Sequence, residues 1–449
     1  MIKRDILAKM DEWAIKKNRK PLVIRGARQV GKTTLVHQFA KKYKQYLYLN
    51  LELRQDKKPF LGFQDVETLL QSLFFLKDKS YSLRAQTLIF IDEIQEVPEA
   101  FNILRYFYES APEIHIVVAG SLLETIFNAT LSFPVGRVEF LLLRPLSFHE
   151  FLLALDEKTA LEQLNQIPIP LFAHEKLLKL FHTYALIGGM PEIISTYAET
   201  KDLFALKSIY DSLLSSYLDD VEKYANSKLQ IQSIRHCIRT AFYEAGKRIK
   251  FQGFGKSSYG SREMSEALRT LEKAFLLQLI HPTTSSQLPI KPELKKSPRL
   301  QFLDTGLVNF YLGIQKEIIG TNDLNKIHQG TLIEHLVGQE LLAHQFNSLS
   351  ALNFWVREKT TSTAEMDYVL SHNGKLIPIE VKSGKEGKLK SLHLFMDESS
   401  QSYAFRLYAG KFEITEAITP KGKKYKLINL PYYLGYKIAD YCDWMEGNN

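Results

Sequence analysis

Cysteine is nearly absent from this chain, which has only Cys237 and Cys442 among 449 residues. Two cysteines cannot build a disulfide framework or a cysteine-rich zinc site, so we expect a reducing, cytoplasmic environment. Long hydrophobic runs are also missing, since none approaches the ~20 residues that a membrane-spanning helix needs. The first residues, MIKRDILAKMDEW, are charged throughout and lack the apolar core of a secretion signal. The sequence therefore predicts a protein with no membrane partner.

The composition is that of an ordinary folded protein. Hydrophobic residues make up 45% of the chain and charged residues 24%. A length of 449 residues exceeds what one hydrophobic core supports and predicts about three domains. The net charge of +8 favours an anionic partner such as nucleic acid, although the excess is modest.

A phosphate-binding loop is the clearest motif. Residues 26–33, GARQVGKT, match the pattern G-x-x-x-x-G-K-[ST] and follow the apolar run Leu22–Ile24. Glycines let such a loop fold around phosphates with its N–H groups pointing inward, and the next helix adds its positive N-terminal end. We expect Lys32 to contact the β- and γ-phosphates of ATP and the Thr33 hydroxyl to bind Mg²⁺. The predicted nucleotide-binding residues are Gly26, Ala27, Arg28, Gln29, Val30, Gly31, Lys32, Thr33, Thr34, Asp92 and Ser121.

Two further apolar runs end in polar residues. Thr87–Ile94 reads as a buried parallel strand that ends in Asp92 and Glu93. Because open α/β sheets bind ligands at this edge, Asp92 is expected to hold Mg²⁺ through water and Glu93 to polarise the attacking water. The run Ile114–Ala119 leads to Ser121, a candidate sensor of the γ-phosphate.

Two arginines follow these strands. Arg137 is the predicted catalytic arginine, donated to the nucleotide of a neighbouring subunit, with Arg144 as the open alternative. For each of them the competing interpretation is a surface arginine in a loop. A shared nucleotide site implies a homo-oligomer.

The middle of the chain divides into two predicted parts. Residues 156–223 have helical periodicity and read as a lid, in which Gly188-Gly189 and Pro191 end one helix and begin the next, and Glu192 is assigned to the turn. Residues 224–320 suit a winged-helix module, with a helix over Ser261–Leu277 that could enter a DNA groove. A protein-packing module with a solvated basic face is the alternative. The basic residues are Lys247, Arg248, Lys250, Arg262, Arg269, Lys273, Lys291, Lys295, Lys296 and Arg299.

A hairpin near the C-terminus carries a second set of carboxylates. Asn373-Gly374 between two alternating runs predicts a two-residue turn, which pairs His372 with Lys375 and places Asp367 opposite Glu380. Facing carboxylates repel each other unless a divalent cation such as Mg²⁺ or Mn²⁺ lies between them.

Lys382 lies two residues beyond Glu380, on the same face of the strand, where it could help deprotonate an attacking water. An amphipathic helix over Gln329–Leu341 precedes the hairpin and carries Glu334 and Glu340. A hairpin with a solvated polar face is the alternative.

The segments RGARQVGKTTL, IFIDEIQ, AGS, FPVGRVEFLLLRPLSFHEF, GGMPE and IEVKSG together resemble a family of prokaryotic AAA+-like P-loop ATPases. In that family the ATPase is joined to a C-terminal domain of unknown function with restriction-endonuclease-like character. The arrangement D-x₁₂-E-x-K formed by Asp367, Glu380 and Lys382 resembles the PD-(D/E)xK nuclease core, although Met366 stands where many members have proline. In that core a glutamate on the preceding helix often joins the metal site, so the resemblance implies Glu334, in preference to Glu340, as the third metal ligand. The resemblance implies a five-stranded parallel sheet, a helical lid and possible oligomers.

The predicted fold class is α/β, with an AAA+-like ATPase core (1–155), a helical lid (156–223), a winged-helix-like module (224–320) and a nuclease-like domain (321–449). The predicted function is Mg²⁺-dependent ATP hydrolysis coupled to DNA binding and metal-dependent DNA processing. Two alternatives remain open. One is an ATP-driven DNA remodeller whose nuclease-like domain does not cleave, and the other is a signalling or toxin-associated NTPase switch that binds protein.

Overall fold

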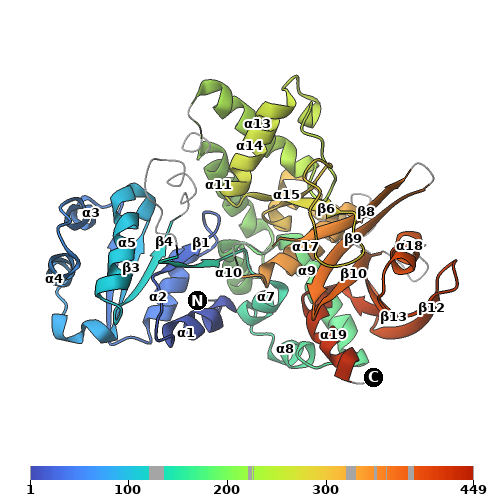
Figure 1. Ribbon diagram of the computed structural model, residues 1–449, viewed down its shortest axis with the longest axis horizontal. Helices are drawn as coiled ribbons and strands as arrows, with labels where there is room; N and C mark the ends of the chain where they lie inside the picture. The colour runs from blue at the N-terminus through green and yellow to red at the C-terminus, as the bar shows by residue number, and fades with distance from the viewer. Residues whose placement is uncertain are drawn as a thin grey trace.

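The computed structural model describes residues 2–120, 136–220, 225, 227–319, 330–347, 351–359, 362–382 and 389–447. Two β-sheets lie on opposite sides of a helical middle, and a pair of helices projects above them (Figure 1). The described part of the chain contains no helix both long and apolar enough to cross a membrane.

The N-terminal sheet has five parallel strands in the order β2-β3-β4-β1-β5. Its strands are β1 (Leu22–Arg25), β2 (Gln45–Asn50), β3 (Thr87–Asp92), β4 (His115–Ala119) and β5 (Glu139–Leu142). Alternate residues of the central strands enter two different hydrophobic cores, one with α1 (Ile6–Ala14) and α2 (Lys32–Ala40). The other core contains α4 (Val66–Leu76) and α5 (Pro98–Ser110), beside the short α3 (Arg54–Leu61). Burial on both faces explains the unbroken apolar runs and confirms the predicted parallel sheet.

The helical middle follows β5. It comprises α7 (Phe148–Ala154), α8 (Lys158–Leu164), α9 (His174–Ile187), α10 (Pro191–Thr200) and α11 (Lys207–Asp219). Gly188 and Pro191 separate α9 from α10, as predicted. Gly188 has φ 75°, and a Cβ there would lie 2.3 Å from Asp304 Oδ1, so both conformation and space require glycine.

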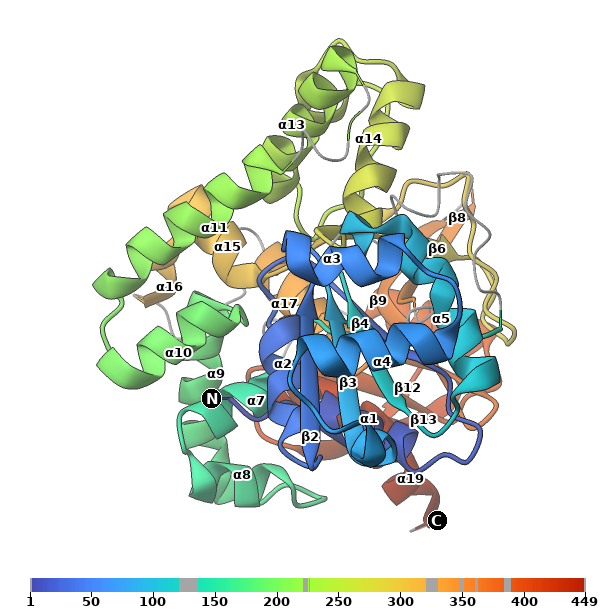
Figure 2. The ribbon, with the colours of Figure 1, turned by 90° about the vertical axis from the view of Figure 1, so that its left-hand side faces the viewer.

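The predicted winged-helix segment contains α13 (Lys228–Tyr243), α14 (Ser261–Lys273) and an antiparallel hairpin of β6 (Leu277–Thr283) and β7 (Arg299–Phe302). The predicted helix over 261–277 is too long at its C-terminal end, because Phe275 has φ 60° and Leu277 already begins β6. β6 also pairs in parallel with β8, so the hairpin is the edge of the second sheet and does not stand apart as a wing. Figure 2 shows α13 and α14 rising as a separate pair above both sheets.

The second sheet has eight strands in the order β12-β13-β11-β10-β9-β8-β6-β7. The strands that follow β7 are β8 (Asn353–Lys359), β9 (Ser362–His372), β10 (Lys375–Val381), β11 (Tyr403–Tyr408), β12 (Glu413–Ile418) and β13 (Lys424–Pro431). The helices of this half are α15 (Thr305–Leu312), α16 (Gln315–Ile319), α17 (Thr331–Ala343), α18 (Lys390–Glu398) and α19 (Ile438–Gly447). The pairing of Lys375 with His372 confirms the predicted hairpin register, which continues to Ile379 and Tyr368.

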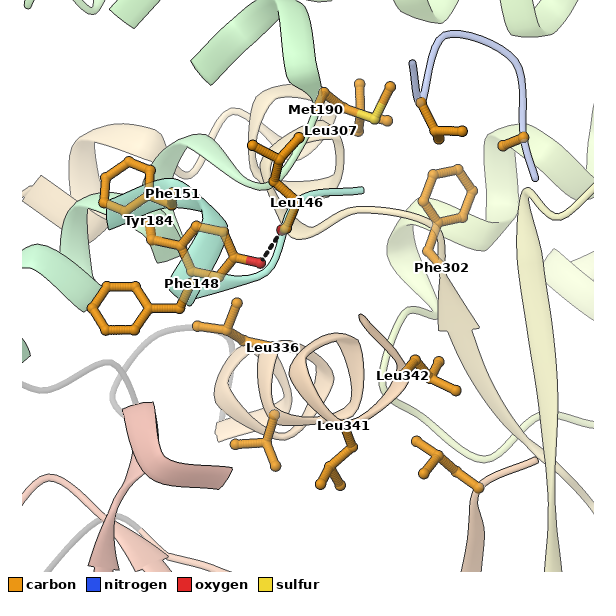
Figure 3. Packing of buried hydrophobic residues seen from close by; sticks show 14 of the residues in the cluster. Leu146, Phe148, Phe151, Tyr184, Met190, Phe302, Leu307, Leu336, Leu341 and Leu342 are labelled. Carbon is orange, nitrogen blue, oxygen red and sulfur yellow. Dashed lines mark hydrogen bonds between the residues drawn. The ribbon is translucent and has the colours of Figure 1, made fainter. Parts of the chain in front are cut away.

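Helix α17 joins the two halves of the molecule. The predicted amphipathic pattern for this helix is wrong, because the polar side chains of His335, Gln339 and Glu340 are buried together with its leucines. Figure 3 shows that Leu336 of α17 faces Phe148 and Tyr184, that Leu342 lies on the side of Phe302, and that Leu341 points away from both. The chain after α17 then reaches the first sheet, where Leu142 N donates to Phe346 O at 2.9 Å.

Candidate functional site

A cavity of about 730 Å³ opens at the predicted phosphate-binding loop. Glu93 and most of the expected loop residues line this cavity. The loop residues are Arg28, Gln29, Gly31, Lys32, Thr33 and Thr34. Gly31 has φ 92° and caps the first turn of α2, so the helix begins at Lys32 with its N-terminal end toward the cavity. Gly26 is held against the β5 exit, where a Cβ would lie 2.2 Å from Leu143 O.

Lys32 folds back onto the loop. Its Nζ donates to Gly26 O at 3.0 Å and to Ala27 O at 2.8 Å. The carbonyl groups of these two residues therefore point toward the Lys32 ammonium. Burial lowers the pKa of Lys32 to about 8, an effect that the carboxylates of Glu93 and Asp92 oppose. An anion entering the cavity would stabilise the charged ammonium.

The two predicted metal-binding groups meet directly. Thr33 Oγ1 donates to Asp92 Oδ2 at 2.7 Å, and Asp92 is buried. Burial raises the pKa of Asp92, while the Thr33 hydrogen bond lowers it. A hydroxyl and a carboxylate are hard oxygen donors, so this pair fits Mg²⁺.

Glu93 follows Asp92 in a left-handed conformation with φ 51°. Its backbone N donates to Asp92 Oδ1 at 3.1 Å, and its carboxylate accepts a hydrogen bond from Gln95 Nε2. A left-handed glutamate is uncommon and turns the side chain away from the strand direction, toward the cavity that Glu93 lines.

The helical middle adds a wall to this cavity. Pro191, Glu192, Ser195 and Thr196 of α10 line it, whereas the sequence left open whether Glu192 contacts nucleotide and favoured a structural turn. The Gly188-Gly189 break was the available signal, because it turns the start of α10 back toward the loop. Ile2, Arg4, Leu35, Gln38, Leu146 and Ser216 also line the cavity.

An ion pair also connects the loop to the helical middle. Arg28 forms an ion pair with Asp220, which follows α11, through both carboxylate oxygens. Tyr217 Oη donates to Arg28 O at 3.0 Å. The loop residue that faces the cavity is therefore connected to α11, the last helix of the helical middle.

The remaining predicted residues of this site lie elsewhere. Ser121 falls outside the described residues. Arg137 lies on the surface, where its Nε contacts Glu109 Oε1 at 3.0 Å. Arg144 lines a different cavity, and neither arginine is among the described residues around the loop.

A second polar centre lies where β9 and β10 emerge beside α17. Val381 N donates to Asp367 Oδ2 at 2.7 Å, and Lys382 Nζ lies 2.7 Å from Glu380 Oε1. A bulge sits at this point of β9, because Asn353 pairs with Val369 whereas Trp355 pairs with Met366. Such bulges re-aim side chains, here that of Asp367.

The carboxylates of Asp367 and Glu380 interact electrostatically with Glu334. Burial raises the pKa of Glu334 and of Glu380 to about 8, and the charge of Asp367 adds to both effects. Burial opposes the charged form of Lys382, yet the Glu380 and Asp367 carboxylates raise its pKa. The buried carboxylates of Asp367 and Glu380 therefore interact with two half-buried groups, Glu334 and Lys382.

Arg299 is the main cation of this centre. It was predicted as part of a basic surface, but it is buried, with Nη2 2.5 Å from Glu365 Oε1 and 3.7 Å from Asp367 Oδ1. The described residues contain no group of three or more His, Cys, Asp or Glu side chains arranged to hold a metal ion. In this arrangement the positive charges of Arg299 and Lys382 balance the acids.

Glu340, the rejected alternative to Glu334, is buried in another place. It accepts hydrogen bonds from Phe148 N at 3.0 and 3.1 Å, and its Oε1 lies 2.7 Å from Tyr184 Oη. These partners belong to α7 and α9, and Glu340 connects α17 to the helical middle.

Comparison with family models identifies an AAA domain in the part of the chain that holds the first site. Residues 18–152 match the family model of an AAA domain, while 178–318 and 329–433 match two domains of unknown function, DUF8612 and DUF4143. No curated protein matches the chain in sequence.

Solved structures resemble it distantly. The Walker-type ATPase paby2304 of Pyrococcus abyssi is 13% identical, with a TM-score of 0.45 over 70% of this chain and 96% of its own. A signal transduction ATPase with a tetratricopeptide repeat sensor from Pyrococcus horikoshii is 15% identical, with a TM-score of 0.27 over 75% of this chain. The match spans only 48% of that protein. These likenesses are too distant to assign an activity.

Proposed function

We propose a hydrolytic cycle for this chain, whose residues 18–152 form a P-loop ATPase domain of the AAA kind. ATP would bind in the cavity of about 730 Å³ with its phosphates against the loop and α2. Lys32 would leave the carbonyls of Gly26 and Ala27 and contact the β- and γ-phosphates. The observation that carries this proposal is the 2.7 Å contact between Thr33 Oγ1 and Asp92 Oδ2 beside that lysine.

Different residues would hold the metal ion and orient the attacking water. Thr33 and Asp92 would hold Mg²⁺, which supplies charge neutralisation at the phosphates when it is bound. Glu93 would orient the attacking water and accept its proton, because its side chain reaches the cavity from the residue after Asp92. The apolar Ile2, Leu146 and Pro191 offer a wall for the adenine base.

Two substitutions test this cycle. We expect Lys32→Ala to lose ATP binding, because the phosphates lose their one buried ammonium. Glu93→Gln should keep ATP affinity within about threefold and lower kcat by roughly 10²–10⁴-fold, the usual contribution of a general base. Glu99→Gln, an exposed carboxylate on α5, is the matched control. Full turnover in Glu93→Gln would refute the assignment of the base.

We further propose that the second polar centre processes DNA with the help of Mg²⁺ or Mn²⁺. The specific support is the interaction of Glu334 and Lys382 with the buried carboxylates of Asp367 and Glu380. The Arg299 guanidinium would have to move away from Asp367 for a metal ion to bind, since the two groups lie 3.7 Å apart at Oδ1. The exposed basic residues Lys250, Arg262, Arg269 and Lys273 offer a surface for the DNA backbone.

Cleavage of labelled duplex, single-stranded and branched DNA tests this second activity. Wild type would be compared with Asp367→Ala and Glu380→Ala, with and without ATP and in either metal. Metal-dependent cleavage that both variants lose would support a nuclease. Binding without cleavage would favour a DNA remodeller, and neither binding nor DNA-stimulated ATP turnover would favour a protein-binding switch.

A homo-oligomer remains part of the proposal, with Arg137 donated to a neighbouring nucleotide. Its support is that Arg137 lies at the surface and lines no part of the cavity in its own chain. If this assignment is correct, Arg137→Ala should lower turnover, and mixing it with Lys32→Ala subunits should restore part of the activity.

A further inference from the structure

A second cavity, of about 320 Å³, lies between the first sheet and the C-terminal half. Its wall combines the end of β5, the α14–β6 connection, β7 and α17. The described residues that line it and those that line the nucleotide cavity do not overlap. Phe302 of β7 and Leu342 of α17, labelled in Figure 3, belong to this wall.

Arg144 is the cation of this cavity. Its Nη2 reaches Gln278 Oε1 at 3.5 Å, a long hydrogen bond, and its buried Nε has no hydrogen-bond partner. Among the described residues no carboxylate forms an ion pair with it. Burial lowers the pKa of Arg144 to about 10. A buried guanidinium normally has a counter-charge, because its five N–H donors are costly to leave unsatisfied.

The acidic residue on the wall does not supply that charge. Glu272 Oε1 accepts a hydrogen bond from Leu279 N at 2.8 Å, and the cation that acts on its carboxylate is Arg269. Burial raises the pKa of Glu272, which weakens its negative charge further. Among the described residues, therefore, no carboxylate pairs with Arg144 at this cavity, and its buried Nε has no hydrogen-bond partner.

The rest of the wall is largely apolar. Phe275 and Phe302 contribute aromatic side chains to it, together with the aliphatic Leu277, Leu303 and Leu342. The volume of about 320 Å³ is at the lower end of small-molecule sites, which run from roughly 300 to 1,000 Å³. Such a site suits a compact ligand with one charged end.

We propose that this cavity binds a small organic anion, with its carboxylate or phosphate group held by Arg144 and its planar apolar body packed against Phe275 and Phe302. The guanidinium fork matches either group in a bidentate geometry. The ligand would bridge the end of β5 and α17, and so would act as an effector between the two halves.

Three aromatic probes of similar size test this proposal by saturation-transfer NMR and calorimetry. Phenyl phosphate and benzoate carry the charge, and benzamide is the neutral match. The full chain is saturated with ADP and Mg²⁺ so that the nucleotide cavity is closed to anions. We expect wild type to bind at least one anionic probe tenfold more tightly than benzamide, and the stronger of the two identifies the charged group.

Two variants change the cavity in different ways, so the conclusion does not depend on a single mutation. Arg144→Met removes the charge and should abolish that tenfold preference. Ala343→Phe fills the cavity from α17 while it keeps Arg144, and should abolish binding of all three probes. Folding of each variant is checked by circular dichroism. Equal affinities for charged and neutral probes in wild type, or unchanged anion binding in either folded variant, would overturn the proposal.

Discussion

The free energy of unfolding of wild type should fall as the pH rises, and replacement of Glu340 by glutamine should prevent this fall. Burial raises the pKa of Glu340 from 4.5 to about 8. The hydrogen bonds agree, because Tyr184 Oη lies 2.7 Å from both Leu146 O and Glu340 Oε1 and has only one hydrogen. Leu146 O can only accept, so the neutral carboxyl must donate to Tyr184 while its other oxygen accepts from Phe148 N.

The sign of the effect follows from proton binding. Between pH 4.5 and 8 the folded protein holds a proton on Glu340 that the unfolded chain has released, so the free energy of unfolding falls as the pH rises. Each pKa unit corresponds to 1.36 kcal/mol, which gives a loss of about 4 kcal/mol between roughly pH 5 and 8.5. Glutamine can reproduce the neutral pattern, with its amide N–H donating to Tyr184 and its oxygen accepting from Phe148 N.

Urea unfolding followed by tryptophan fluorescence at pH 5 and 8.5 measures this difference. The stability of Glu340→Gln relative to wild type should increase by about 4 kcal/mol from the lower to the higher pH, the same linkage value. Glu99→Gln, on the exposed face of α5, should follow wild type at both pH values. A pH-independent difference between Glu340→Gln and wild type would refute the neutral carboxyl.

Two further substitutions address the charged contacts. Asp220→Asn should tighten ATP binding about three- to tenfold in titration calorimetry, because it releases Arg28 toward the phosphates and removes a negative charge near the cavity. The exposed neighbour Asp219→Asn is its control, and equal effects would refute the ion pair as the cause. Arg299→Met should destabilise the fold by about 3–5 kcal/mol, since it leaves buried carboxylates unpaired. Added Mn²⁺ should recover part of the melting temperature if Asp367 binds metal, and no recovery would argue against the metal site.

The two motifs of the phosphate-binding site could be predicted because each is a local pattern. The loop with the start of α2 is one, and the apolar strand that ends in Asp92 is the other. Their meeting at 2.7 Å between Thr33 Oγ1 and Asp92 Oδ2 comes from the parallel sheet, which brings together residues 59 apart in sequence. The hairpin of β9 and β10 was predictable for the same reason, since Asn373-Gly374 fixes its register.

Other features depended on contacts between distant segments. The ends of α14 and β6 were missed because Phe275 adopts φ 60° without being glycine. Helix α17 has a pattern that looks amphipathic, yet both of its faces are covered. The sequence indicates a surface cation at Arg299, but the second sheet buries this side chain beside Glu365.

The amino-acid pattern was enough to predict the phosphate-binding loop, the Asn373-Gly374 hairpin and the apolar strands of the parallel sheet. Each of these depends on backbone conformation and hydrogen bonding within a short segment, so neighbouring residues are enough to indicate it. Contacts between remote segments instead place Glu192 at the nucleotide cavity, Arg28 beside Asp220 and Arg144 at a cavity of its own. Burial and charge pairing depend on which remote segment covers a side chain, and no local pattern encodes that covering.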